Sequence, residues 1–156
     1  IATSTNTLYT IISVGNRPMG IAITPDGTRA YVTIQEDNQV KVIDIATNTV
    51  TDTITLDNSP FGIAITPDGT RAYVTIENDN QVKVIDTATN TVIHTINVGE
   101  SPAGIAITPD GTQAYTANIM DNTVSVINLD TNTVVATVNA GDHPNAIAIG
   151  TVCVDY

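Results

Sequence analysis

The side chains best suited to acid–base chemistry lie near the C-terminus, where His143 directly follows Asp142. A positioned histidine can take up and release a proton near neutral pH. No GxSxG motif and no pair of histidines spaced for zinc accompanies this pair. The sequence therefore predicts no catalytic residue, no cofactor and no enzymatic activity.

A second candidate chemistry is calcium binding by carboxylates in short polar turns: Glu36, Asp37, Glu77, Asp79 and Asp121. Ca²⁺ takes about six to eight oxygen ligands. These carboxylates belong to different repeats of the chain and lack the spacing of an EF-hand loop. We therefore expect solvated turn tips and no metal site. Cys153 is the only cysteine, so a disulfide within the chain is excluded.

The charge balance excludes two classes of partner. The 156 residues include 16 Asp and Glu but only 5 Lys and Arg, which gives a formal net charge of −11. Nucleic acids and anionic membranes attract clustered basic side chains, and no apolar run reaches the ~20 residues of a membrane helix. We expect no nucleic-acid partner and no membrane insertion.

The surface is expected to be polar but weakly charged. Charged residues make up 13% of the chain, whereas threonine occurs 27 times. This charged fraction is about half that of an average soluble domain, so Thr and Asn must solvate the surface instead. The composition favours a location outside the cell or at the cell surface.

The chain that carries these residues repeats every 42 positions. Ile-Ala-Ile-Thr-Pro-Asp-Gly-Thr occupies 21–28, 63–70 and 105–112. A fixed spacing of this length is typical of repeat architectures. Prolines and tyrosines keep the same step: Pro18, Pro60, Pro102, Pro144, Tyr31, Tyr73 and Tyr115.

Each repeat predicts four short strands separated by turn residues. In the first complete unit they cover 20–24, 29–34, 39–44 and 49–56, and their apolar residues alternate with polar ones. An antiparallel meander of about 40–45 residues is typical of one propeller blade. We therefore predict an all-β fold, a β-propeller of four-stranded antiparallel blades.

This single propeller domain has an incomplete blade at each end. The expected divisions are a partial blade over 1–17, blades over 18–59, 60–101 and 102–143, and a partial blade over 144–156.

The two ends of the chain predict complementary strands of one shared blade. An outer strand is expected over 7–14 and an inner strand over 146–149, with a tail that could add a further strand. The residues expected to take part in self-assembly are Leu8, Tyr9, Ile11, Ile12, Val14, Ile147, Ile149, Val152 and Val154.

Because an unpaired strand edge invites pairing with another chain, several outcomes stay open. The chain could close on itself as a four-bladed ring, or two chains could form an eight-bladed ring. Open head-to-tail pairing would give a filament. The chain could also be a fragment of a longer protein.

One end of each blade varies between repeats, whereas the Thr-Pro-Asp-Gly-Thr and Thr-Asn-Thr turns at the other end are nearly fixed. Variable loops on a rigid scaffold are where binding usually occurs. The candidate binding face comprises Arg17, Met19, Phe61, Glu36, Asp37, Glu77, Asp79, Asp121 and His143.

Tyr31-Val32-Thr33 and Tyr73-Val74-Thr75, each followed by Asn-x-Val-x-Val-Ile-Asp, resemble the YVTN β-propeller repeat. Thr-Pro-Asp-Gly before each tyrosine strengthens the resemblance, which covers essentially the whole chain. The third copy departs from the pattern with Tyr115-Thr116-Ala117. The resemblance implies a propeller like those of archaeal and bacterial surface-layer proteins, and related propellers include lactonases.

These observations together favour a non-enzymatic, extracellular structural protein that self-assembles in a surface layer or fibre, with the terminal strands joining the chains into a homo-oligomer or filament. The alternative is a ligand- or protein-binding module of a larger surface or adhesin-like protein, which would use the variable loops. A lactonase-like enzyme is the remaining hypothesis, because fold alone does not fix function.

Overall fold

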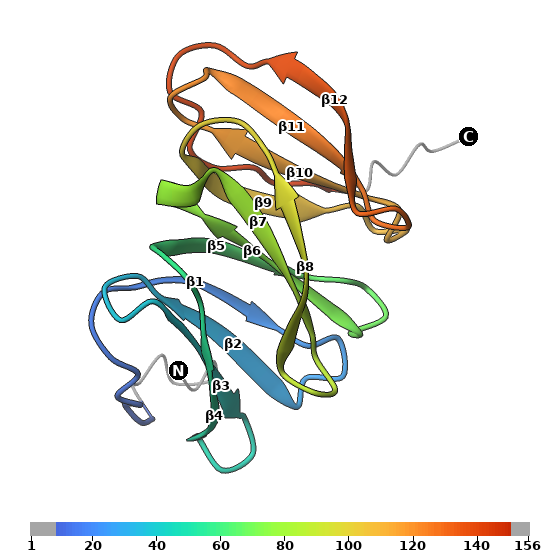
Figure 1. The fold of residues 1–156 in the computed structure, drawn as a ribbon. Coiled ribbons are helices and arrows are strands. Elements are labelled where there is room, and N and C mark those ends of the chain that lie inside the picture. The colour runs from blue at the N-terminus through green and yellow to red at the C-terminus, as the bar shows by residue number, and fades with distance from the viewer. Residues whose placement is uncertain (1–8, 151–156) are drawn as a thin grey trace.

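The computed structural model describes residues 9–150, which form three four-stranded antiparallel sheets stacked one upon the next in chain order (Figure 1). In each sheet, strands that are consecutive in sequence pair with one another. The predicted all-β fold built of propeller blades is confirmed.

We refer to the three sheets as blades 1, 2 and 3. Blade 1 consists of β1 (Pro18–Ile23), β2 (Arg29–Ile34), β3 (Gln39–Asp44) and β4 (Thr49–Thr55). Blade 2 consists of β5 (Pro60–Ile65), β6 (Arg71–Ile76), β7 (Gln81–Asp86) and β8 (Thr91–Asn97). Blade 3 consists of β9 (Pro102–Ile107), β10 (Gln113–Asn118), β11 (Thr123–Asn128) and β12 (Thr133–Asn139).

The turn between the first two strands of each blade is stabilised by one aspartate. In blade 1, Asp26 Oδ1 accepts hydrogen bonds from Thr24 Oγ1 at 2.6 Å, from the Thr28 amide at 3.0 Å and from Thr28 Oγ1 at 2.9 Å. Gly27 takes the positive φ of 70° that the turn requires. These hydrogen bonds lower the pKa of Asp26 to about 2. Asp68 and Asp110 repeat the arrangement in blades 2 and 3.

The turn before each outer strand depends on an asparagine in the left-handed conformation. Asn48 has a φ of 56°, and Asp44 accepts hydrogen bonds from the amide and hydroxyl of Thr47. Asparagine tolerates this conformation better than most residues. In blade 3 an amide replaces the acid, and the Thr131 amide donates to Asn128 Oδ1 at 2.9 Å. The fixed turns therefore set the register of each meander.

The second strand of a blade is buried on both faces, which a simple alternating pattern does not predict. Every residue of β2 from Ala30 to Ile34 is buried. Blade 2 covers one side of β2, and Ile12 and Val14 pack against the other, so side chains on both faces of the strand are buried. Packing between blades, rather than within one, forms the hydrophobic core.

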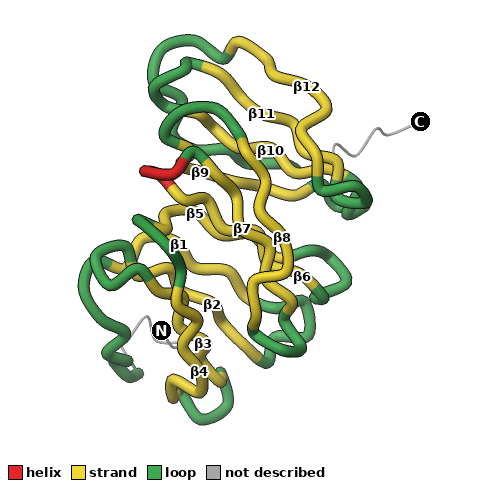
Figure 2. The backbone as a smooth tube through the Cα atoms, viewed as in Figure 1, coloured by secondary structure: helices red, strands yellow, loops and turns green. Residues whose placement is uncertain are grey.

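The predicted strand bounds differ from the observed ones mainly at the first strand. β1 begins at Pro18, earlier than the expected residue 20, because a bulge between Pro18 and Ile21 lets the proline join the ladder. A short 3₁₀ helix, η1 (Glu77–Asp79), replaces a simple turn in blade 2 and is red in Figure 2.

The strands predicted at the two ends are not paired within the described chain. Residues 9–14 and 146–149 form no ladder with any part of the chain that the structure describes. A strand needs a partner for its backbone groups, and the strands that would pair with these two segments are not among the described residues. Leu8, Val152, Cys153 and Val154 lie outside those residues. Across 9–150, no helix is long and apolar enough to cross a membrane.

Candidate functional site

The contact between neighbouring blades begins at the innermost strands, where a threonine bridges two chain segments. In blade 2, the Gly62 amide donates to Thr75 Oγ1 at 2.7 Å, and this hydroxyl donates to the Ala103 carbonyl of blade 3 at 2.6 Å. Thr33 makes the same bridge from Gly20 to Phe61. A Cβ on Gly62 would collide with the Ala103 carbonyl. Glycine therefore permits the close approach of the inner strands.

A tyrosine fixes the next part of each blade contact. Tyr31 donates its hydroxyl hydrogen to Asn90 Oδ1 of blade 2 at 2.8 Å, and Tyr73 donates in the same way to Asn132 of blade 3 at 2.7 Å. Burial raises the pKa of both tyrosines, so they stay neutral donors. Arg29 and Arg71 lie about 6 Å from the ring centres and donate to backbone carbonyls of the following blade.

The apolar part of the contact joins two distinct faces. We call the face that meets the following blade the forward face, and the face that meets the preceding blade the backward face. Between blades 1 and 2, the forward face includes Tyr31, Val40, Val42, Ile54 and Leu56. The backward face includes Ile63, Ala72, Val74, Ile76 and Ile85.

The backward face of blade 1 is exposed along β1, whereas its other apolar residues, Ala30, Val32, Ile34 and Ile43, are buried. Ile21 is 64% exposed, whereas Ile63 and Ile105, which hold the same position in blades 2 and 3, are each 8% exposed. Ile23 is exposed as well, and a groove of about 210 Å³ lies beside Ile21, lined also by Met19 and Val32. Ile12 and Val14 pack against the buried part of this face, so its exposed part is the strip along β1.

The forward face of blade 3 is open in the complementary way. Val138 is 53% exposed, whereas Ile54 and Ile96 in the same position are 5% and 4% exposed. Tyr115 cannot reach an asparagine of a following blade, and it donates to Gln113 Oε1 at 2.9 Å instead.

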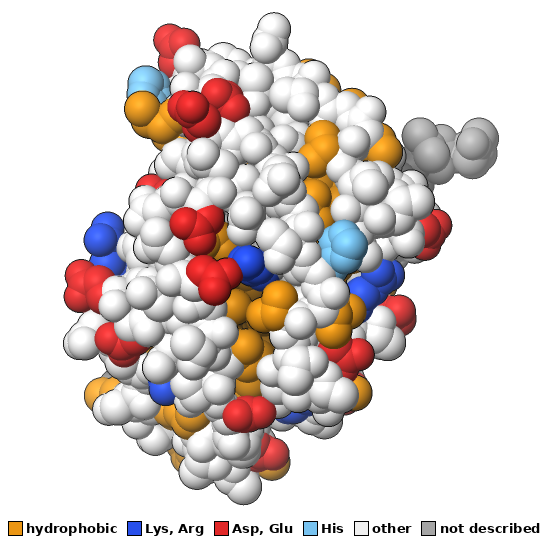
Figure 3. Space-filling view, in the orientation of Figure 1, with side chains coloured by type: hydrophobic (Ala, Val, Ile, Leu, Met, Phe, Trp, Pro, Cys, Tyr) orange, Lys and Arg blue, Asp and Glu red, His pale blue; other side chains and the backbone are white. Residues whose placement is uncertain are grey.

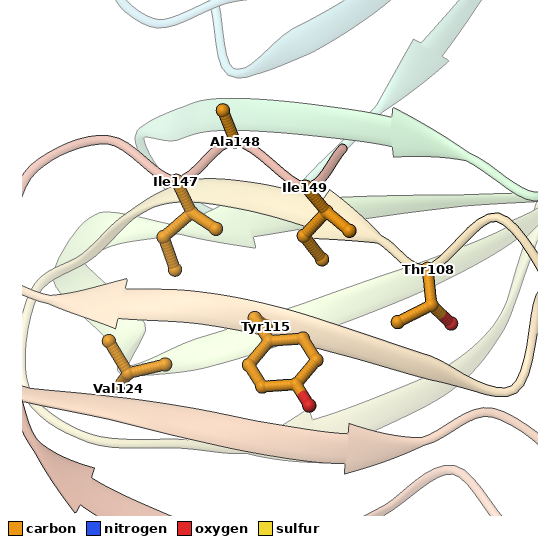
Figure 4. Close-up of a pocket in the computed structure, with 6 residues that line it drawn as sticks. All are labelled: Thr108, Tyr115, Val124, Ile147, Ala148 and Ile149. Carbon is orange, nitrogen blue, oxygen red and sulfur yellow. The ribbon is translucent and has the colours of Figure 1, made fainter. Parts of the chain in front are cut away.

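An apolar groove of about 370 Å³ runs along the forward face of blade 3 (Figure 4). Tyr115 and Val124 form one wall. Ile147 and Ile149 point toward them from the opposite side, whereas Ala148 points away. The groove is therefore lined by blade 3 and by the segment that follows it.

The two end segments lie where strands of further blades would lie. Ile12 and Val14 are half-buried against Ala30, Val32 and Ile34, in the places that Ile54 and Leu56 take one repeat later. At the other end, the Gly104 amide donates to the Asn145 carbonyl at 2.9 Å. Each segment thus covers part of an open face.

The carboxylates of the predicted loop face mostly stabilise the loops. Asp37 accepts hydrogen bonds from the Asn16 amide and side chain, and Asp121 accepts from the Glu100 amide at 2.7 Å. Asp79 accepts from Asn58 Nδ2. Backbone amides and asparagine side chains of the loops thus account for the positions of these three acids.

Glu77 is held by two neighbouring blades. Its carboxylate accepts a hydrogen bond from Gln35 Nε2 at 2.7 Å. It also accepts longer hydrogen bonds, each of 3.4 Å, from Ser59 Oγ and Ser101 Oγ. Gln35 Oε1 is buried without a hydrogen-bond partner among the described residues. The network ties the three blades together at this end.

The remaining members of the predicted face do not converge on one cavity. Arg17 and His143 take positive φ values of 59° and 52°, and the His143 amide donates to Asn122 Oδ1 at 2.9 Å. Glu36 is exposed, Phe61 is half-buried, and Met19 lines the groove of blade 1. Within residues 9–150, no three His, Cys, Asp or Glu side chains lie close enough to hold a metal ion.

Sequence reasoning missed the side chains of the exposed faces, chiefly Ile21, Tyr115, Val124 and Val138. They are identical or similar to residues buried in the inner contacts, so hydrophobicity does not distinguish them. Their position in the first or last blade was the available signal. The face of the molecule seen in Figure 3 is mostly uncharged and polar, with scattered acidic and basic side chains.

Solved structures show similar folds. A chain of hydrazine synthase from Kuenenia stuttgartiensis matches with 32% identity and a TM-score of 0.80, over 83% of this chain and 38% of that one. A functionally unknown protein from Desulfotomaculum acetoxidans matches with 23% identity and a TM-score of 0.77, over 85% and 45%. The WD40 repeats of RRP9 match with 17% identity and a TM-score of 0.76, over 83% and 41%.

The present chain therefore spans less than half the length of each of these structures. A search of curated protein sequences finds no match. Residues 9–112 match a family model described as "YNCE-like beta-propeller".

Proposed function

Because the chain belongs to the YNCE-like β-propeller family, we propose that it acts as a non-enzymatic structural protein whose copies associate end to end. The forward face of blade 3 on one copy and the backward face of blade 1 on the next form the joint, where the terminal segments also lie. This role needs no cofactor and no reaction centre.

One observation carries the proposal: part of the contact that is buried twice inside the chain is exposed on the outer faces of blades 1 and 3. Ile21 is 64% exposed where its two counterparts are 8% exposed. Leaving such side chains in water costs roughly 1.5–3 kcal/mol each relative to full burial. Patches of this kind usually mark interaction sites.

We place this assembly outside the cell, in a surface layer or a fibre. The support is the YVTN-type resemblance of Tyr31-Val32-Thr33 and Tyr73-Val74-Thr75, which implies a likeness to surface-layer propellers. The exposed outer strands rich in threonine agree with it, since every threonine of β4 is solvent-exposed. Hydroxyl groups rather than charges keep this surface hydrated.

The proposal predicts that Ile21→Asp abolishes self-association. A carboxylate at this position would have to be buried without a partner in the joint, at a cost that exceeds the contact it replaces. Ile93→Asp is the matched control, because Ile93 is 51% exposed on β8 and lies outside both open faces. Light scattering over a range of protein concentrations measures the mass of each variant.

Two results would contradict the proposal. One is a wild-type protein that stays monomeric at every concentration. The other is equal loss of association in Ile21→Asp and Ile93→Asp, which would mean that the contact is not at the open face. Electron microscopy of the wild-type protein then separates closed rings from fibres or layers.

A binding module is the second candidate, favoured by the exposed side chains at the variable loops. Met120 is 62% exposed there, close in sequence to the exposed Asp121. Such loops would present a ligand with a mixed apolar and acidic surface. A triple change of Arg17, Phe61 and His143 that removes binding of a ligand but spares association would favour this candidate.

A further inference from the structure

Blades 2 and 3 differ in the charge that they bring to their backward faces. In blade 2, Lys83 is buried there, and its ammonium lies 2.6 Å from the Asp57 carboxylate and donates to Thr95 Oγ1 at 3.2 Å. Asp57 belongs to the segment that joins blades 1 and 2. A carboxylate beside a buried ammonium offsets the cost of taking that charge out of water. Blade 2 therefore supplies its own cation at this place.

Blade 3 has lost both members of this ion pair. One repeat after Lys83 stands Ser125, and one repeat after Asp57 stands Gly99. Ser125 is 1% exposed, so this position is buried in both blades. Blade 3 brings no ammonium to it, and the segment that joins blades 2 and 3 brings no carboxylate at the place of Asp57.

Oxygen-bearing side chains gather at this place in blade 3. Asn118, which stands one repeat after Ile76, is fully buried. Its Nδ2 donates to Thr123 Oγ1 and to Ser125 Oγ, each at 2.9 Å. Its Oδ1 is buried and accepts no hydrogen bond from the described residues. Buried polar atoms nearly always have a partner, so this oxygen points to a ligand.

The Asn118 amide can turn without losing its contacts. Both of its partners are hydroxyl groups, and a hydroxyl can either accept or donate a hydrogen bond. The amide could therefore rotate about its Cβ–Cγ bond and present Oδ1 to Thr123 and Ser125 in place of Nδ2. The amide oxygen is thus available to a ligand in either orientation of the side chain.

A carboxylate lies beside this amide. Asp121 Oδ2 and Asn118 Nδ2 would each lie 2.5 Å from a Cβ on residue 99, so both groups converge on Gly99. The Glu100 amide fixes the Asp121 carboxylate there by donating to Oδ2 at 2.7 Å. A carboxylate has about four lone-pair sites, so most of its capacity to bind a ligand stays free. A side chain at residue 99 would push the two groups apart.

We propose that this cluster binds a calcium ion in place of the ammonium that blade 2 supplies. The ligands are oxygen atoms of the Asp121 carboxylate, the Asn118 amide and the hydroxyls of Thr123 and Ser125. Ca²⁺ prefers oxygen ligands and takes about six to eight of them in flexible geometry, so water would complete its shell. Zn²⁺ and copper favour nitrogen and sulfur. One carboxylate among neutral oxygens predicts a weak site, with a dissociation constant of about 10⁻⁴–10⁻³ M as in extracellular modules.

Calcium should therefore stabilise the folded chain. A ligand that binds only the folded state, with a dissociation constant of about 1 mM, raises the folding equilibrium constant about tenfold at roughly 10 mM. Urea unfolding of the wild-type protein with and without calcium chloride, at constant ionic strength, measures this gain. A wild-type protein that shows no gain overturns the proposal, because Asn118 Oδ1 would then be satisfied by water alone.

Asp121→Asn should remove the gain. The new side chain can still accept from the Glu100 amide, so the loop is preserved, but the carboxylate of the cluster is gone. Asp79→Asn is the matched control, because Asp79 holds the same position in blade 2 and accepts from Asn58 Nδ2. The control should keep the gain of about tenfold. Equal gains in the two variants would mean that calcium binds scattered surface acids, which overturns the site.

Ser125→Lys should also make the stability independent of calcium. Lysine is the residue of blades 1 and 2 at this position, Lys41 and Lys83, and its ammonium would take the place of the ion. A Ser125→Lys protein that keeps the full gain overturns the exchange of one cation for another. The comparison of residues 121 and 79 decides the question if this variant does not fold. Because the cluster lies in blade 3 and the segment before it, the gain does not depend on self-association, and a protein that stays monomeric leaves the site standing.

Discussion

Single hydroxyl groups connect the blades at the innermost strands. Thr33 and Thr75 each accept from one backbone amide and donate to a carbonyl of the following blade. Blade 3 has Ala117 in this place, and there Gly104 donates directly to Asn145. The presence of a threonine hydroxyl thus decides whether the inner strands of two blades are joined through a side chain or by a direct backbone hydrogen bond.

Thr75→Val should destabilise the protein by about 1–3 kcal/mol, the usual cost of leaving a buried backbone donor and acceptor unpaired. Valine keeps the shape of threonine, so the packing of the strand is preserved. Thr75→Ser, which keeps the hydroxyl, is the control. Urea unfolding followed by circular dichroism measures both, and equal stability of the valine variant and the wild type would contradict the bridge.

The aspartates of the first turns make stability depend on pH. Hydrogen bonds from threonine lower the pKa of Asp26 to about 2, and those of Asp68 and Asp110 are lowered as well. A carboxylate with a lowered folded pKa stabilises the fold above its unfolded pKa, about 3.9. That contribution is lost as the pH falls toward 2.

We therefore expect the melting temperature to fall between about pH 4 and pH 2, and the fall to be smaller in Asp26→Asn. The amide can still accept from the Thr28 amide but no longer titrates. Thermal melts at several pH values test this. An Asp26→Asn protein with the full acid sensitivity of the wild type would show that other groups cause it.

At the scale of the element, the turns decide what sequence can predict. The second and third strands were expected over 29–34 and 39–44, and β2 and β3 have those bounds, because Pro-Asp-Gly and Asn at positive φ leave little freedom. The end segments were expected as strands from the same repeat, and the structure shows none. Alternation is a property of a sequence, whereas a strand also requires a neighbour.

Gly104→Ala should release residues 145–149 and leave the blades folded. The new Cβ would lie 2.7 Å from the Asn145 carbonyl. Residues 145–149 can move away, because one backbone hydrogen bond, from Gly104 to Asn145, joins them to blade 3. Hydrogen exchange should then be faster for the amide of residue 104, which donates to Asn145, and unchanged in β6 and β7. Gly62→Ala is the comparison, since its Cβ would strike the Ala103 carbonyl inside the core, and it should destabilise the whole protein.

At the scale of the whole molecule, the 42-residue repeat predicted the stacking of blades. It did not predict which side chains are exposed at the candidate site. The loop residues Asp37, Asp79 and Asp121 looked available from the sequence, but loop amides occupy them. Conversely, Ile21 and Val138 looked like ordinary core residues. Exposure depends on which blade is first or last, a property that no single repeat contains.

The two boundaries between the described blades use the same glycine, threonine, tyrosine and asparagine positions, so blades 1 and 2 are interchangeable units. Unequal recombination between two repeats of the gene would add or delete one whole unit whose two sides already match their new neighbours. Descendants with different numbers of blades could then arise in a single genetic step, with no interface to be re-evolved.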